Sequence, residues 1–145
     1  MSSDDAAGIL LRFSNGARAT ISISQVSSGR NNSINWEISG PEGSLAFDSE
    51  NPEQLWIGHR GRANEVLHKD PGMLSPDAAR TAFYPGGHVE GFSETFRGLF
   101  ERVYEDINNG TQSNSYPTFA DGVKSLEITD AIAQSSKSSA WVKIA

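Results

Sequence analysis

One short segment combines residue types that could bind a hydroxyl-rich ligand. Residues 84–92 read Tyr-Pro-Gly-Gly-His-Val-Glu-Gly-Phe, and the paired glycines let the backbone turn sharply and approach a ligand closely. A helix is expected to begin just afterwards, and the unpaired amides and dipole of a first helical turn oppose protonation of a nearby imidazole. A neutral His88 can then donate to or accept from a hydroxyl group. The alternative is that His88 only caps the helix or packs beside Tyr84.

Arg30 and an acid/base set are two further candidate sites. Arg30 stands in the polar loop 27–32, where an arginine is usually solvated and occasionally holds a ligand. His88, Glu90 and Asp121 could form an acid/base set, but no nucleophile, metal or orienting third group accompanies them. The sequence therefore predicts no catalytic residue.

Motifs that would define other reactions are absent from the sequence. The glycines of residues 86–91 follow no predicted strand and lack the spacing of a dinucleotide fingerprint. There is no Cys, no GxSxG elbow and no HExxH, and the three histidines are too far apart to bind a metal together. We therefore expect no metal site and no cofactor bound by this chain.

Composition narrows the class of protein. The 145 residues are enough for one domain, 1–145, with a sizeable core. Twelve Lys and Arg against eighteen Asp and Glu give a net charge of −6, which argues against nucleic acid as a partner. No apolar run approaches the roughly 20 residues of a membrane span. The first residues lack the basic-then-apolar order of a signal peptide, so a cytoplasmic location is expected.

The first half predicts antiparallel strands. Apolar and polar residues alternate in five or six short runs separated by turn residues, of which Ser14-Asn15-Gly16 is the strongest hairpin signal. One face of the resulting meander is apolar. The other is rich in Ser, Thr, Asn and Glu yet carries Trp56, so it is either a solvated face or a surface on which a second subunit lies.

The second half predicts two helices and a closing strand. Residues 92–107 carry an apolar stripe at helical spacing, expected to cover the sheet. A second helix begins after Thr118, whose side chain can form a capping box with Asp121, and it is apolar on two sides. Residues 135–139 are expected to be a polar connection, and 141–144 a strand. The fold class is α+β: a mostly antiparallel open sheet of about six strands with helices packed on one face.

Three stretches, taken in order, resemble one family. They are SQVSSGRNNSINWEISGPEGSLAFDSENPEQLWIG (24–58), YPGGHVEGFSETF (84–96) and YPTFADGVKSLEITDAIAQSS (116–136). The chain is similar to the C-terminal domain of the Gfo/Idh/MocA oxidoreductases, which are NAD(P)-dependent sugar, inositol and polyol dehydrogenases. The family's Gly-rich fingerprint, its Glu-Lys-Pro motif, and its proton-transferring Asp and His lie upstream of the matched region, and none appears here.

The resemblance implies a substrate-side and oligomerisation domain that is inactive alone. Its partners would be an upstream Rossmann domain carrying NAD or NADP, a small sugar-like substrate, and further copies of itself across the open sheet face. His88 and Tyr84, with Arg30, would contribute to substrate binding. The competing hypothesis is a stand-alone α+β ligand-binding or dimerisation module.

Overall fold

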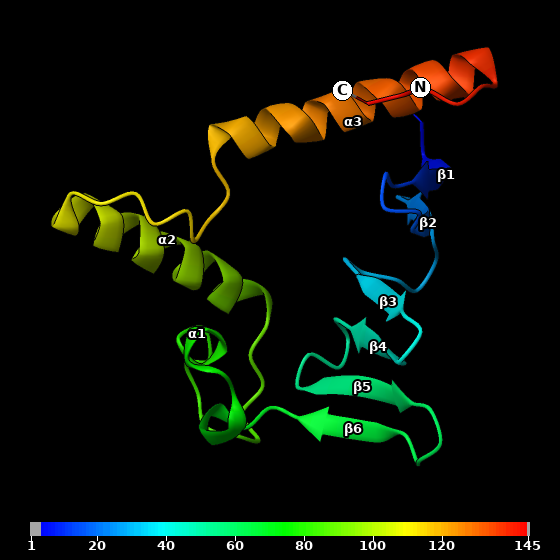
Figure 1. Cartoon of the computed structure of the whole chain (residues 1–145). Coiled ribbons are helices and arrows are strands. Elements are labelled where there is room, and N and C mark those ends of the chain that lie inside the picture. Colours follow the sequence, from blue (N-terminus) through cyan, green and yellow to red (C-terminus); the bar gives the residue numbers. More distant parts are fainter. Residues whose placement is uncertain (1–3, 145) are drawn as a thin grey trace. The chain divides into compact units, whose positions relative to one another are not determined.

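A computed structural model describes residues 4–144, which divide between two compact units. The first contains the chain up to Arg30 together with the segment from Pro117 onward; the second is Asn31–Tyr116. Figure 1 labels the elements of both. In each unit antiparallel strands are combined with helices, which confirms the predicted α+β class.

The first unit holds a hairpin and the longest helix. Strands β1 (Ala6–Arg12) and β2 (Arg18–Ser24) pair antiparallel, with Ile9 opposite Ile21. The predicted turn joins them, and its Gly16 adopts φ 92°, a conformation that favours glycine. Helix α3 spans Phe119–Ser138. The Thr118 hydroxyl accepts the Asp121 N–H, and the Asp121 carboxylate accepts the Thr118 N–H at 2.8 Å, so the predicted capping box is confirmed.

Two predictions at the end of the chain are wrong. The expected polar connection 135–139 is helical through Ser138, whose hydroxyl donates to the Gln134 carbonyl at 2.8 Å. Residues 141–144 form no strand. The Arg12 guanidinium instead lies over the Trp141 ring, with its Cζ 4.0 Å from the ring centre. This segment therefore contacts β1 through a side chain.

The second unit is built on a four-stranded antiparallel sheet in the order β3-β4-β5-β6. Its strands are β3 (Asn35–Ser39), β4 (Gly43–Asp48), β5 (Gln54–His59) and β6 (Glu65–His68). The six strands found within residues 4–144 match the predicted number, although they form two ladders rather than one. The polar loop between β2 and β3 separates them, with Gly29 and Asn32 both at positive φ.

The register confirms the predicted difference between the two faces of this sheet. Residues opposite each other in a ladder share a face. One face carries the apolar set Trp36, Ile38, Leu45, Phe47, Leu55, Ile57 and Leu67. The other carries Glu37, Ala46, Trp56 and Val66 in one row.

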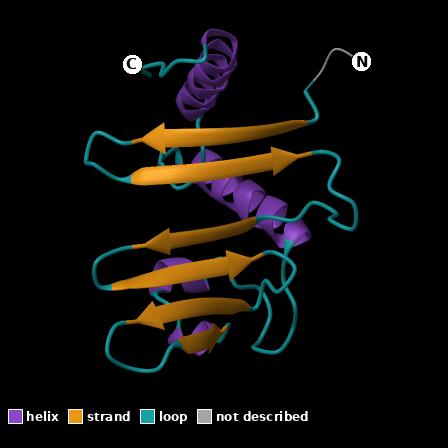
Figure 2. Cartoon of the chain, turned by 90° about the vertical axis from the view of Figure 1, so that its right-hand side faces the viewer, coloured by secondary structure: helices purple, strands orange, loops and turns teal. Residues whose placement is uncertain are grey.

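Helices of the second unit lie on one side of its sheet, as Figure 2 shows for α1 and α2. Between β6 and α2 the chain forms two short helices, η1 (Pro71–Met73) and α1 (Pro76–Ala79), each capped by the side chain before its proline. Helix α2 spans Phe92–Asn109 and ends at Gly110 in the left-handed conformation, as the Asn-Asn-Gly sequence indicates.

The apolar stripe of α2 does not fully cover the sheet. Within the second unit Leu99 and Val103 are half-buried, but the aromatic side chains beside them are not: Phe100 is 55% and Tyr104 63% exposed. Phe83 packs against the inner side of this helix, with its ring 3.7 Å from the position that a Cβ on Gly98 would occupy. The expectation of a sheet-covering stripe is therefore wrong for the aromatic part of α2.

Asp106 is the only buried charged residue of the described chain and organises the end of α2. Its carboxylate accepts the Ser113 N–H at 2.8 Å, the Thr111 hydroxyl at 2.8 Å and the Ser113 hydroxyl at 3.0 Å. These bonds, the Ser113 amide first, hold the pKa of Asp106 below its ordinary value. Burial and the same carboxylate raise the pKa of Tyr116.

This depressed pKa makes a prediction about acid stability. A carboxylate whose folded pKa is lowered stabilises the protein above its unfolded pKa, and that contribution is lost as pH falls through the folded value. Asp106→Asn is therefore expected to lower the melting temperature by several degrees at pH 7, with the difference from wild type shrinking below about pH 4. Melting curves from pH 3 to pH 7 check this; a difference that does not depend on pH would contradict it.

None of the helices in residues 4–144 is both long enough and apolar enough to cross a membrane.

Candidate functional site: a pinned loop at residues 83–91

The β5–β6 hairpin brings two opposite charges together. Gln54 pairs with His68, so Glu53 and Lys69 are the next residues across the ladder, and the Lys69 N–H donates to the Glu53 carbonyl at 2.8 Å. Their side chains meet as well, with Lys69 Nζ 3.2 Å from Glu53 Oε2. Opposite charges facing each other across strands stabilise a sheet.

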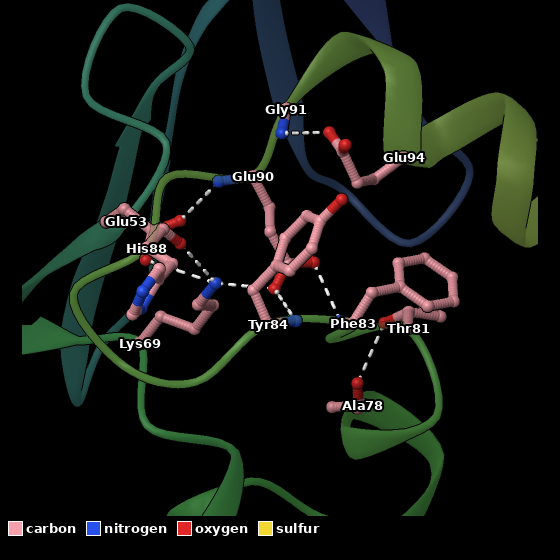
Figure 3. A network of polar contacts seen from close by, with 10 residues as sticks. All are labelled: Glu53, Lys69, Ala78, Thr81, Phe83, Tyr84, His88, Glu90, Gly91 and Glu94. Carbon is pink, nitrogen blue, oxygen red and sulfur yellow. Dashed lines mark hydrogen bonds and ion pairs between the residues drawn. The ribbon is translucent and has the colours of Figure 1, made fainter.

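Glu90 closes the loop that precedes α2. Its carboxylate accepts the main-chain N–H groups of Phe83 at 2.9 Å and Tyr84 at 2.7 Å, seven and six residues earlier in the chain. The Glu90 N–H in turn donates to Glu53 Oε1 at 2.8 Å. The Phe83 end of this segment is thus tied to the Glu90 carboxylate and its Glu90 end to the Glu53 carboxylate, as Figure 3 shows.

Lys69 joins these carboxylates to the middle of the loop. Its ammonium lies 2.6 Å from Glu90 Oε1 and donates to the His88 carbonyl at 2.9 Å. Only 14% of the Lys69 side chain and 9% of the Glu90 side chain are exposed. Burial alone would disfavour both charges, but the hydrogen bonds and charges between them prevail: the pKa of Lys69 is raised and the pKa of Glu90 is lowered.

The two glycines have separate roles in the loop. Gly87 adopts φ 80°, and the His88 N–H closes the turn onto the Pro85 carbonyl at 3.2 Å. A Cβ on Gly86 would lie 3.2 Å from the Lys69 carbonyl oxygen. The close approach that the sequence suggested for a ligand is therefore made to the main chain of Lys69.

Tyr84 and His88, two of the predicted site residues, lie on this loop and are exposed. In Figure 3 their rings lie on opposite sides of the Lys69 ammonium, so His88 does not pack beside Tyr84. His88 does not cap α2 either, because the N-cap is Gly91. Arg30 belongs to the first unit, in the loop after β2, where its N–H donates to the Ser27 carbonyl at 3.2 Å.

Two members of the acid/base set His88, Glu90 and Asp121 have their carboxylates bound to other groups. Glu90 is bound by Lys69 and two amides, and the Asp121 carboxylate caps α3. Glu53 and Lys69 were missed by sequence analysis. The signal that could have found them is that they flank a predicted hairpin symmetrically, but the hairpin register was needed to use it.

The loop can present hydrogen-bonding groups to a polar ligand. Its exposed side chains are a phenol and an imidazole, which recognise hydroxyl groups. Within residues 4–144 no group of three or more His, Asp or Glu could hold a metal ion.

A carboxylate lies at the first turn of each long helix. In α2 the Gly91 N–H donates to Glu94 Oε2 at 2.8 Å. In α3 the Thr118 N–H donates to Asp121 Oδ2 at 2.8 Å. A carboxylate at a helix N-terminus occupies the position that a phosphate would take and repels it. The N-termini of α2 and α3 therefore do not fit the phosphates of a dinucleotide.

A second feature is the indole of Trp56 on the polar face of the four-stranded sheet. A Cβ on Gly58 would lie 2.5 Å from Trp56 Cη2 and 2.8 Å from Cζ3, so the ring lies directly over the glycine. It is 36% exposed, in a shallow hollow whose polar lining is Asn35, Glu37, Asp48, Asn51 and Gln54.

Comparisons with known proteins place this fold among oxidoreductases. Residues 2–144 match the family described as "Oxidoreductase family, C-terminal alpha/beta domain". Levoglucosan dehydrogenase from Pseudarthrobacter phenanthrenivorans is 28% identical over 151 residues, covering 97% of this chain and 36% of that protein.

Solved structures give the same result. An oxidoreductase from Sinorhizobium meliloti superimposes with a TM-score of 0.91 at 31% identity, over 99% of this chain and 42% of that one. Levoglucosan dehydrogenase in complex with NADH and levoglucosan gives a TM-score of 0.87 at 28% identity, over 99% of this chain and 39% of that one. An inositol dehydrogenase homolog from Azotobacter vinelandii, complexed with NADH and myo-inositol, gives a TM-score of 0.77 at 26% identity. The match covers 92% of this chain and 37% of that one. The chain spans about two-fifths of the length of these relatives.

Proposed function

Since this chain belongs to the C-terminal α/β domain family of the Gfo/Idh/MocA oxidoreductases, we propose that it is the substrate-side domain of an NAD(P)-dependent sugar or polyol dehydrogenase. The observation that carries the proposal is the match over nearly the whole chain to proteins crystallised with NADH and levoglucosan or myo-inositol. A cytoplasmic location is part of the proposal.

In this proposal the cofactor is held by a Rossmann domain outside the 145 residues. The occupied helix N-termini and the absence of a Gly-rich fingerprint support that division. The nicotinamide would supply the hydride chemistry when bound, and this chain would bind and orient the substrate hydroxyl. No proton or hydride transfer is assigned to its residues.

The substrate contacts in this proposal are His88 and Tyr84 on the pinned loop, with Arg30 as a further contributor. The loop supports the assignment because its main chain is fixed by partly buried charges while its phenol and imidazole stay exposed. Side chains fixed in this way bind a polyol at a smaller entropic cost.

We also propose that copies of the chain associate through the sheet face that carries Trp56. A half-exposed indole within a polar rim resembles the aromatic residues that anchor protein interfaces. A two-fold arrangement would place the same face of each copy against the other.

The proposal predicts that the 145-residue chain alone neither binds NADH nor oxidises a polyol. Isothermal titration of the purified chain with NADH should give no heat of binding up to millimolar concentration, while the complete oxidoreductase binds it at about 1 µM to 1 mM, the usual range for enzyme substrates. The activity assay pairs each protein with NAD or NADP and a panel of sugars and polyols. Micromolar NADH binding by the chain alone would contradict the division of roles.

The alternative, a stand-alone α+β ligand-binding or dimerisation module, makes a different prediction. The coding sequence upstream of Met1 separates the two. An open frame running back into a strand–GxGxxG–helix unit supports the oxidoreductase, and a stop codon before Met1 supports the module.

A further inference from the structure

We infer that Lys69, assisted by Glu53, is a positioning residue that sets the main chain at His88 and thereby determines how tightly the substrate is bound. The inference rests on the proposed function, because it treats His88 as a substrate contact. Lys69 would not touch the substrate itself; its ammonium donates to the His88 carbonyl at 2.9 Å.

The geometry makes Lys69 the link between the sheet and the loop. Its main chain is fixed by the β5–β6 ladder, and its side chain reaches from there to Glu53, Glu90 and the His88 carbonyl. A strand end is a rigid support, whereas a loop containing two glycines is not. The position of His88 is therefore set by the strand through Lys69.

The charges explain why a neutral side chain would not replace Lys69. Glu53 and Glu90 face the same ammonium, and their side chains are only 17% and 9% exposed. Without a cation between them, two partly buried carboxylates repel each other across the space that holds the loop. Lys69→Met keeps most of the side-chain volume and removes that cation, so the loop is expected to open.

Two measurements on the complete oxidoreductase test the inference. In steady-state kinetics Lys69→Met should raise the KM for the sugar or polyol about 10-fold or more, with the KM for the cofactor unchanged. Hydrogen exchange followed by mass spectrometry should show faster exchange at residues 83–91 and unchanged exchange in β4. Lys124→Met, an exposed lysine on α3, is the matched control and should alter neither.

A double-variant cycle separates positioning from a general structural role. If Lys69 acts through His88, then Lys69→Met combined with His88→Ala should raise the substrate KM no further than His88→Ala alone. Glu53→Gln keeps an acceptor for the Glu90 N–H and removes one charge, so it should also raise the substrate KM, by less than Lys69→Met. This variant replaces Lys69→Met in the experiment if Lys69→Met does not fold.

The following outcomes would overturn the inference: additive effects in the double variant, an equal rise in the cofactor KM, or unchanged exchange at residues 83–91. Failure of the proposed function looks different. In that case the complete protein oxidises no polyol in the panel, while Lys69→Met still accelerates exchange in the loop.

Discussion

Glu90→Ala is expected to lower the free energy of unfolding by about 3 kcal/mol, because it leaves an ammonium and two amides in a partly buried site without their acceptor. The groups affected are Lys69 and the N–H groups of Phe83 and Tyr84. Urea denaturation of the purified protein at pH 7 measures the change.

The matched control is Glu101→Ala. Glu101 pairs with Arg97 one turn away on α2, and both side chains are 52% exposed. An exposed pair of this kind contributes little, so the midpoint of unfolding should hardly move. Equal destabilisation by the two substitutions would show that the cluster contributes no more than a surface pair.

The pKa shifts give the Glu90 effect a pH window. The lowered pKa of Glu90 means that its contribution is complete above its ordinary pKa of 4.5 and is lost as pH falls through the folded value. The raised pKa of Lys69 means that its contribution is complete below 10.5 and is lost as pH rises through the folded value. The difference between wild type and Glu90→Ala should therefore be largest between these two values and narrow on either side.

Trp56→Asp is expected to weaken association of the protein by about 30-fold or more, because an interface anchor contributes at least about 2 kcal/mol and the new carboxylate of one copy would face that of the other. Sedimentation equilibrium over a range of concentrations measures the dissociation constant. Met73→Asp adds the same charge at a residue that is 75% exposed in η1, and it should leave association unchanged.

Gly58→Ala provides a second variant that adds no charge. A methyl group there would meet the indole at 2.5 Å, so the ring must move off the sheet, and association should weaken by less than in Trp56→Asp. A wild-type protein that stays monomeric at high concentration would refute this interface, as would Trp56→Asp associating like wild type.

Local patterns in the sequence were sufficient to predict most elements. The hairpin at Asn15-Gly16, the capping box at Thr118 and the end of α2 at Gly110 all depend on neighbouring residues whose chemistry is readable in order. Period-two alternation likewise predicted that the sheet has one apolar face and one largely polar face that carries Trp56. The errors arose where local preference was weak: the polar residues 135–138 are acceptable in a helix, and Trp141 has a partner in Arg12 that no local pattern indicates.

The sequence by itself determined the α+β class, the order of the six strands and the two long helices, and the loop on which His88 and Tyr84 lie. Only the tertiary structure decided that Glu53, Lys69 and Glu90 meet, because their contact depends on a hairpin register and on a chain reversal of 37 residues between Glu53 and Glu90. It also decided that Leu99 and Val103 are half-buried while Phe100 and Tyr104 are exposed, a difference that the apolar periodicity of α2 does not make. Bonds within a few residues are encoded locally, whereas charges brought together from distant segments depend on the assembled fold.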